Sequence, residues 1–144
     1  MIPQFYVDTN VLIDFLADRK PFSESATSIF SLAVKKRIKL FISAISYNNI
    51  YYIIQRENKS HKKTIALLEL LSEDCTILDT TKSILQNAML ADFKDFEDAL
   101  QNFAAVNDGT IDCVVTRNVK DFKNSYLSVM TPDTFLSFYK SRIH

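Results

Sequence analysis

The sequence has little glycine, cysteine, histidine or tryptophan, and each shortage excludes a class of protein. Its 144 residues include one Gly, three Pro and no Trp, which excludes collagen-like repeats, low-complexity segments and long irregular loops. The two cysteines, Cys75 and Cys113, lie in apolar segments without Cys or His at metal-ligand spacing. We therefore expect two buried free thiols and a cytoplasmic location. The two histidines, His61 and His144, do not form a pair, which argues against a zinc site or a histidine base.

Net charge and long apolar runs are also absent. Seventeen basic residues balance seventeen acidic ones, so any polyanion must bind locally, for example at the basic clusters 35–39, 59–63 and 117–123. Such clusters are, however, more often simply a solvated surface. No apolar run approaches the roughly 18 residues of a membrane helix, and the N-terminus does not resemble a secretion signal. With 47% hydrophobic residues, we expect one globular domain over residues 1–144 and no membrane partner.

Short β-favouring runs alternate with helical periodicity along the chain. The patterns predict strands at 4–7, 38–43, 75–79, 111–116 and 127–130, and helices at 10–18, 22–36, 44–55, 60–74, 81–91, 95–106 and 131–139. The helix at 44–55 is uniformly apolar and is expected to be buried, and the helix at 95–106 is expected to bury Phe96, Leu100, Phe103 and Ala104. Strands joined through helices predict a three-layer α/β/α fold with a central, mainly parallel, Rossmann-like sheet.

Polar residues follow two of these strands at the edge where parallel α/β sheets form their sites. Asp8 follows the first strand directly, and Asn118 and Asp121 come just after the fourth. Acids at strand ends, without a catalytic Cys–His pair or a Gly-rich phosphate loop, favour oxygen ligation of Mg²⁺ or Mn²⁺. Such a cation can hold a phosphodiester and activate water.

Four motifs in order resemble the PIN-domain family, which includes many small endoribonucleases and the VapC-type toxins of toxin–antitoxin pairs. They are "VDTNVLIDFL", "SAISYNNIYYII", "DFEDALQNFAA" and "VVTRNVKDF", followed by the closing "VMTPDTFL". The family usually has Glu where Asn49 stands and often Asp where Asn118 stands. The chain therefore resembles a PIN subgroup with Asn in place of two of the usual acids.

The resemblance implies a PIN-like fold and a divalent-metal-dependent endoribonuclease that hydrolyses RNA phosphodiesters. It implies that Asp8 and Asp98 bind the metal and that Asn10, Asn49 and Asn118 complete the catalytic set by positioning ligands or water. From its place three residues beyond Asn118, we expect Asp121 to add charge as a third metal-holding acid. Two amides in place of acids remove two negative charges and weaken metal binding, which Glu97 or Asp121 could restore. The implied partners are RNA, an antitoxin protein that covers the active-site groove, and a second copy of the chain in a homodimer.

Other interpretations of these residues remain open. Asp8 also suits a helix N-cap, Asp98 a solvated surface, and Asn49 a structural amide. The acids Asp14, Asp18 and Asp112 are expected at the surface or in turns, and Arg117 and Lys120 are expected to be solvated. The alternative functions are a catalytically degenerate PIN-fold module that binds RNA or protein, and, with poor motif support, a receiver-type phosphoacceptor domain.

Overall fold

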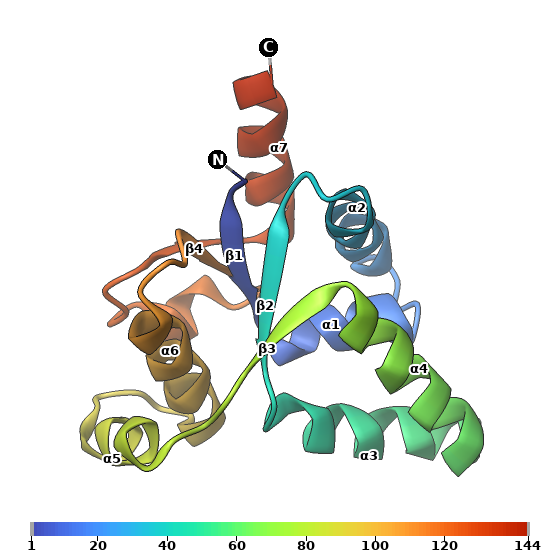
Figure 1. Cartoon of the computed structure of the whole chain (residues 1–144), viewed down its shortest axis with the longest axis horizontal. Coiled ribbons are helices and arrows are strands. Elements are labelled where there is room, and N and C mark those ends of the chain that lie inside the picture. Colours follow the sequence, from blue (N-terminus) through green and yellow to red (C-terminus); the bar gives the residue numbers. More distant parts are fainter. Residues whose placement is uncertain (1, 144) are drawn as a thin grey trace.

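Five short strands form one parallel sheet at the centre of the protein (Figure 1). The computed structural model describes residues 2–143, with side chains described as far as residue 141, so His144 lies outside the described residues. The strand order is β3-β2-β1-β4-β5, and every neighbouring pair is parallel. The strands are β1 (Gln4–Val7), β2 (Lys39–Ser43), β3 (Cys75–Leu78), β4 (Cys113–Val115) and β5 (Ser128–Met130).

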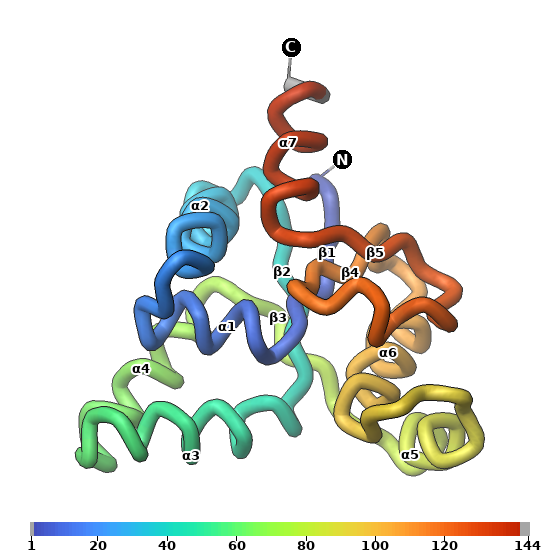
Figure 2. Tube along the Cα trace, turned by 180° about the vertical axis from the view of Figure 1, so that it is seen from behind, coloured from blue at the N-terminus to red at the C-terminus, as the bar shows by residue number. Residues whose placement is uncertain are grey.

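Helices cover both faces of the sheet, as Figures 1 and 2 show. One face packs against α1 (Thr9–Leu16), α2 (Ser23–Val34), α3 (Ser46–Asn58), α4 (His61–Glu73) and α7 (Pro132–Ile143). The other face packs against α6 (Phe96–Asp108) and the short 3-10 helix η1 (Val119–Phe122), and α5 (Lys82–Leu90) packs on α6. The predicted three-layer α/β/α fold is confirmed.

Alternation along the strands produces these two cores, because successive side chains of a strand point to opposite faces. Phe5 and Val7 join the larger core, whereas Tyr6 between them joins the smaller one. In β2, Phe41 likewise lies on the opposite face from its two neighbours. Because β1 is the central strand and is covered on both faces, a charged side chain is expected only beyond its end, and β1 ends immediately before Asp8.

Three details of the predicted elements were wrong. The helix predicted at 44–55 is α3, but it buries only one face, and Tyr52 is 57% exposed. Phe96 was expected in the core but is 49% exposed, because it is the first residue of α6 and precedes the packed turns. Cys113 is buried, whereas Cys75 on the edge strand β3 is only partly buried; both are free thiols. Across residues 2–143 no helix combines the length and apolarity that a membrane crossing requires.

Asp14 and Arg117 form an ion pair that contradicts two predictions. Asp14 was expected at the surface but is 1% exposed, and Arg117 Nε lies 2.7 Å from its Oδ2. Arg117 was expected to be solvated, yet its guanidinium also lies 3.9 Å from the ring centroid of Phe22. The pair joins α1 to the segment after β4, and it explains how an acid inside an apolar helix keeps a charge partner. Asp18 and Asp112, by contrast, are exposed as predicted.

We expect Arg117→Ala to lower the free energy of unfolding by about 2 kcal/mol at neutral pH, because Asp14 is left as a buried charge without this partner. Burial raises the pKa of Asp14 and Arg117 opposes that rise, so its removal raises the pKa further. Asp14 then takes up a proton in the folded state as the pH falls, and the loss should shrink near about pH 4.5. Urea unfolding at both pH values, with the exposed Arg56→Ala as control, checks this; an equal loss at both would contradict it.

Candidate functional site

Asp8 is a buried carboxylate held by two side chains that come from different parts of the chain. It lies at the end of β1 as the N-cap of α1 and is 2% exposed. Its Oδ1 accepts a hydrogen bond from Gln101 Nε2 at 2.9 Å, and its Oδ2 accepts one from Thr116 Oγ1 at 2.8 Å. Burial raises the pKa of Asp8, and these two hydrogen bonds act in the opposite direction. The donors therefore fix both carboxylate oxygens at the carboxyl edge of the sheet.

Gln101 on α6 is the centre of a buried polar network beneath Asp8. While its amide nitrogen donates to Asp8, its Oε1 accepts from the backbone N–H and the hydroxyl of Thr9, at 3.0 and 3.1 Å, and from the Tyr6 hydroxyl at 3.3 Å. Tyr6 also shares a hydrogen bond of 2.6 Å with Ser43 at the end of β2. Burial raises the pKa of Tyr6, so the phenol stays protonated and available as a donor. The network joins β1, β2, α1 and α6 around Asp8.

Asp98 is an acid of α6 whose pKa is strongly raised. It is half-buried in the first turn of α6. Burial, followed by the negative charge of Asp8 and then by those of Asp95, Asp121 and Glu97, raises the pKa of Asp98 to about 7. Asp98 lies about one helical turn before Gln101, whose side chain donates to Asp8, so α6 brings Asp98 to the same edge of the sheet as Asp8. The charge of Asp121, which follows β4, acts on Asp98 from a separate segment of the chain.

The three predicted amides lie in different surroundings. Asn49 is half-buried on α3, and its Nδ2 donates to Glu97 Oε2 at 3.1 Å. Asn10 is half-buried in the first turn of α1. Asn118 is exposed, and its backbone N–H donates to Thr116 Oγ1 at 3.1 Å, the same hydroxyl that donates to Asp8. Asn49 therefore contacts an acid of the cluster through its side chain, whereas Asn118 supports the Thr116–Asp8 contact through its backbone.

The donor chemistry of this edge fits a hard divalent cation. The cluster offers carboxylate and amide oxygens and carries negative charge that its members do not balance, as the raised pKa of Asp98 reflects. The nearby cation Arg117 is paired with Asp14. Within residues 2–143, however, no three His, Cys, Asp or Glu side chains are already arranged as a coordination cage. The side chains therefore provide the oxygen ligands that a divalent ion prefers, but the acids would have to move closer to one another to bind it.

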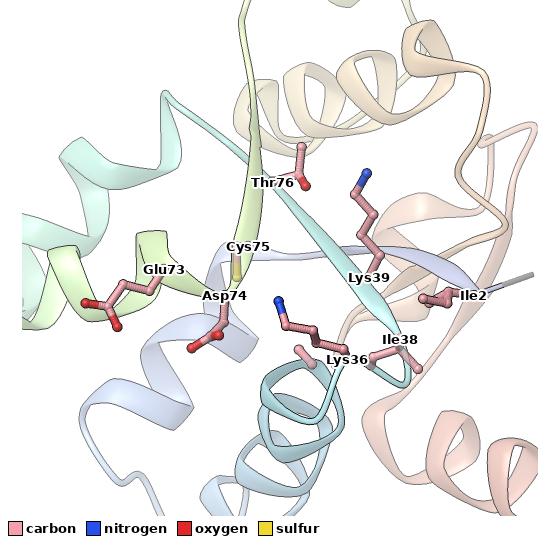
Figure 3. A pocket seen from close by; sticks show the side chains of 9 residues that line it. Ile2, Lys36, Ile38, Lys39, Glu73, Asp74, Cys75 and Thr76 are labelled. Carbon is pink, nitrogen blue, oxygen red and sulfur yellow. The ribbon is translucent and has the colours of Figure 1, made fainter.

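Two hollows in the surface differ in their distance from the acids Asp8, Asp98 and Asp121. One, of about 310 Å³, adjoins Asp121 and includes Lys94, Lys120 and Lys123 in its wall. The other, of about 300 Å³, is shown in Figure 3 and is lined by both charge signs, with Lys36 and Lys39 as its cations and Glu73 and Asp74 as its acids. This second hollow lies at the amino ends of β2 and β3, at the opposite edge of the sheet from Asp8. Only the first hollow is therefore positioned to serve the acidic cluster.

Gln101 and Thr116 are functional-looking residues that the sequence analysis missed as partners of Asp8. Gln101 follows Asp98 by three residues, so it lies on nearly the same face of α6. A glutamine within an otherwise apolar helical stripe was the available signal, since a buried amide requires hydrogen-bond partners. Which partners it would find depended on the parallel pairing of β1 with β4, which the local sequence does not specify.

Comparison with known proteins assigns the fold. A solved toxin–antitoxin complex from Klebsiella pneumoniae matches at 22% identity and a TM-score of 0.61, over 88% of this chain and 96% of that one. VapBC2 from Rickettsia felis, bound to a promoter DNA fragment, matches at 17% identity and a TM-score of 0.63, over 89% and 98%. VapC20 of Mycobacterium tuberculosis, a toxin that cleaves the sarcin–ricin loop, matches at 18% identity and a TM-score of 0.60, over 76% and 86%.

The TM-scores of 0.60 to 0.63 over most of each chain establish a shared fold. No curated protein sequence matches the chain. A family model for the PIN domain matches residues 4–120, which include β1, Asp8, Asp98 and the first two residues of η1. The resemblance noted in the sequence is thereby confirmed, and the chain belongs to the PIN domain family.

Proposed function

We propose that this protein is a divalent-metal-dependent endoribonuclease that hydrolyses RNA phosphodiesters. The observation that carries the proposal is the convergence of Asp8 and Asp98 at the carboxyl edge of the sheet, where mutual repulsion and burial raise the pKa of Asp98 to about 7. Acids held together at such a cost in free energy are typical of functional sites. Membership of the PIN domain family and the likeness to VapC toxins support a nuclease of the toxin type.

The charge distribution supports RNA as the substrate. Lys94, Lys120 and Lys123 line the hollow that adjoins Asp121, so cations for the phosphate backbone stand beside the acids. One of the matched structures is described as a toxin that cleaves the sarcin–ricin loop. We therefore assign the lysines to backbone binding and the acids to cleavage.

The side chains have distinct roles in the proposed reaction. Asp8, Asp98 and Asp121 would hold Mg²⁺ or Mn²⁺, which when bound would neutralise phosphate charge and make water a better nucleophile. Gln101 and Thr116 keep both oxygens of Asp8 in place. Burial and the neighbouring acids raise the pKa of Asp98 to about 7 in the metal-free site, so a bound cation would favour its ionised form. Asn10, Asn49 and Asn118 orient ligands or water as uncharged groups.

We further infer that the protein is the toxin of a toxin–antitoxin pair, acts in the cytoplasm and forms a homodimer. The support is that three of the matched solved structures are toxin–antitoxin complexes or VapBC assemblies. The proposed antitoxin is a protein that covers the edge bearing Asp8 and Asp98 and so blocks access to RNA.

One observation favours a second candidate, a PIN-fold module that binds RNA or protein without cleaving. Both oxygens of Asp8 already accept hydrogen bonds from protein donors, and the acids among residues 2–143 are not arranged as a coordination cage. A module of this kind would retain the lysine-lined hollow and bind RNA equally well with or without a divalent ion.

Cleavage of an RNA panel in Mn²⁺ and then Mg²⁺ tests the two candidates. For a nuclease, we expect metal-dependent cleavage that Asp8→Asn and Asp98→Asn each reduce by at least about 100-fold, because each removes a charged ligand. The matched control is Asp112→Asn, which removes an exposed acid at the opposite edge of the sheet, where it accepts from the Gln4 N–H at 3.0 Å.

The control should cleave like the unmodified protein. If the unmodified protein binds RNA but cleaves none with either ion, while its circular dichroism spectrum shows it to be folded, the binding module replaces the nuclease. If it cleaves and Asp98→Asn has no effect, the proposed metal site is wrong.

The raised pKa of Asp98 predicts a pH dependence. Its carboxyl must be ionised to hold a cation, so cleavage at limiting metal should fall about tenfold per pH unit below about 7. Without metal the sign is opposite for stability. Because the folded pKa exceeds the unfolded value of 3.8, the folded state binds the proton more tightly, and the thermal midpoint should rise as the pH falls from about 8 towards about 5. Asp98→Asn should flatten both profiles; unchanged profiles would contradict the role of Asp98.

A further inference from the structure

A hydrogen bond between Asn49 and Glu97 joins two helices that approach the site from separate parts of the chain. Asn49 Nδ2 on α3 lies 3.1 Å from Glu97 Oε2 and 3.5 Å from Oε1, across a sequence separation of 48 residues. Glu97 is half-buried in the first turn of α6, directly before Asp98 and one turn before Gln101, which donates to Asp8. The fold therefore orients this carboxylate, which a solvated surface acid would not require.

Glu97 faces the same negative centre as Asp98. Glu97 and Asp98 are consecutive in the first turn of α6, and the charge of Asp8 acts on both of them. Asp95, the other acid at this helix start, is engaged differently. It is the N-cap of α6, and its Oδ1 accepts from the Asp98 backbone N–H at 3.0 Å. Of the two, only Glu97 presents oxygens that a side chain of another helix holds towards the cluster.

We propose that Glu97 is a further metal-holding carboxylate of this site and that Asn49 is its positioning residue. The inference rests on the proposed function and deepens it. Asn49, as an uncharged amide on α3, donates to the Glu97 carboxylate, which brings the negative charge from α6. Glu97 offers the charge and Asn49 fixes its direction, so the two residues act as one unit.

Mn²⁺ binding by the full chain tests this directly, because the electron paramagnetic resonance signal of free Mn²⁺ reports affinity without any need for cleavage. We expect Glu97→Gln, which keeps the shape and can still contact Asn49, to weaken Mn²⁺ binding about tenfold or more, since carboxylate charge sets the affinity of oxygen sites. The matched control is Asp95→Asn, which removes a charge two residues away yet can still cap α6. It should weaken binding less than about threefold.

A carboxylate exchange makes the test specific. Combining Asn49→Glu with Glu97→Gln moves the charge to the other partner of the same hydrogen bond, with donor and acceptor reversed. We expect this double variant to recover Mn²⁺ affinity to within about threefold of the unmodified chain. A purely structural role for the contact would not return metal affinity in this way.

Each outcome separates this inference from the proposed function when RNA cleavage is followed in parallel. The role of Glu97 would be overturned, even if the protein cleaves RNA, by any of three results. Glu97→Gln and Asp95→Asn could lose equal Mn²⁺ affinity, Glu97→Gln could bind Mn²⁺ like the unmodified chain, or the double variant could fail to recover Mn²⁺ affinity. If Glu97→Gln lowers Mn²⁺ affinity as expected but the unmodified protein cleaves no RNA, the role of Glu97 in metal binding would be supported and the nuclease function would be rejected. An unmodified chain that binds no Mn²⁺ would overturn both.

Discussion

The buried carboxylate of Asp8 is the constraint on which the site depends. A charge at the end of the central strand can stay inside the protein only because Gln101 from α6 and Thr116 after β4 donate to its two oxygens. Those donors tie the strands β1 and β4 and both helical layers to one point. The rest of the cluster is arranged around this charge, and each acid added to it raises the cost of keeping the others ionised.

The two layers contribute unequally to the site. The layer containing α1 supplies Asp8 and, through Asp14, holds Arg117 against Phe22. The layer containing α6 supplies Gln101, Glu97 and Asp98, whose spacing along one helix turns them towards the same edge. A single helix therefore carries both the groups that stabilise the buried charge and the acids that oppose it. Along this helix, the negative charges of Glu97 and Asp98 lower stability, whereas the hydrogen bond from Gln101 to Asp8 raises it.

Periodicity was sufficient to predict the fold, whereas the site could be predicted only in part. Strands as short as Cys113–Val115 were recognisable because helices separate them and because they are almost wholly apolar. Asp8 and Asp98 stood out as acids at element boundaries. The Asp14–Arg117 pair was missed because its partners are 103 residues apart, and Gln101 was missed because its role depends on which loop meets it. Long-range polar pairing has no local sequence signal, and that accounts for most of the error.

The pairing of Arg117 with Asp14 directs its guanidinium to a buried acid of α1 and away from the acids at the end of β1. In the proposed nuclease, a polyanion that reaches the lysine-lined hollow would therefore meet repulsion as it extends towards Asp8. A bound divalent cation would reduce that repulsion. The ion pair that stabilises the fold would thus make binding of the nucleic acid at this edge depend on the metal.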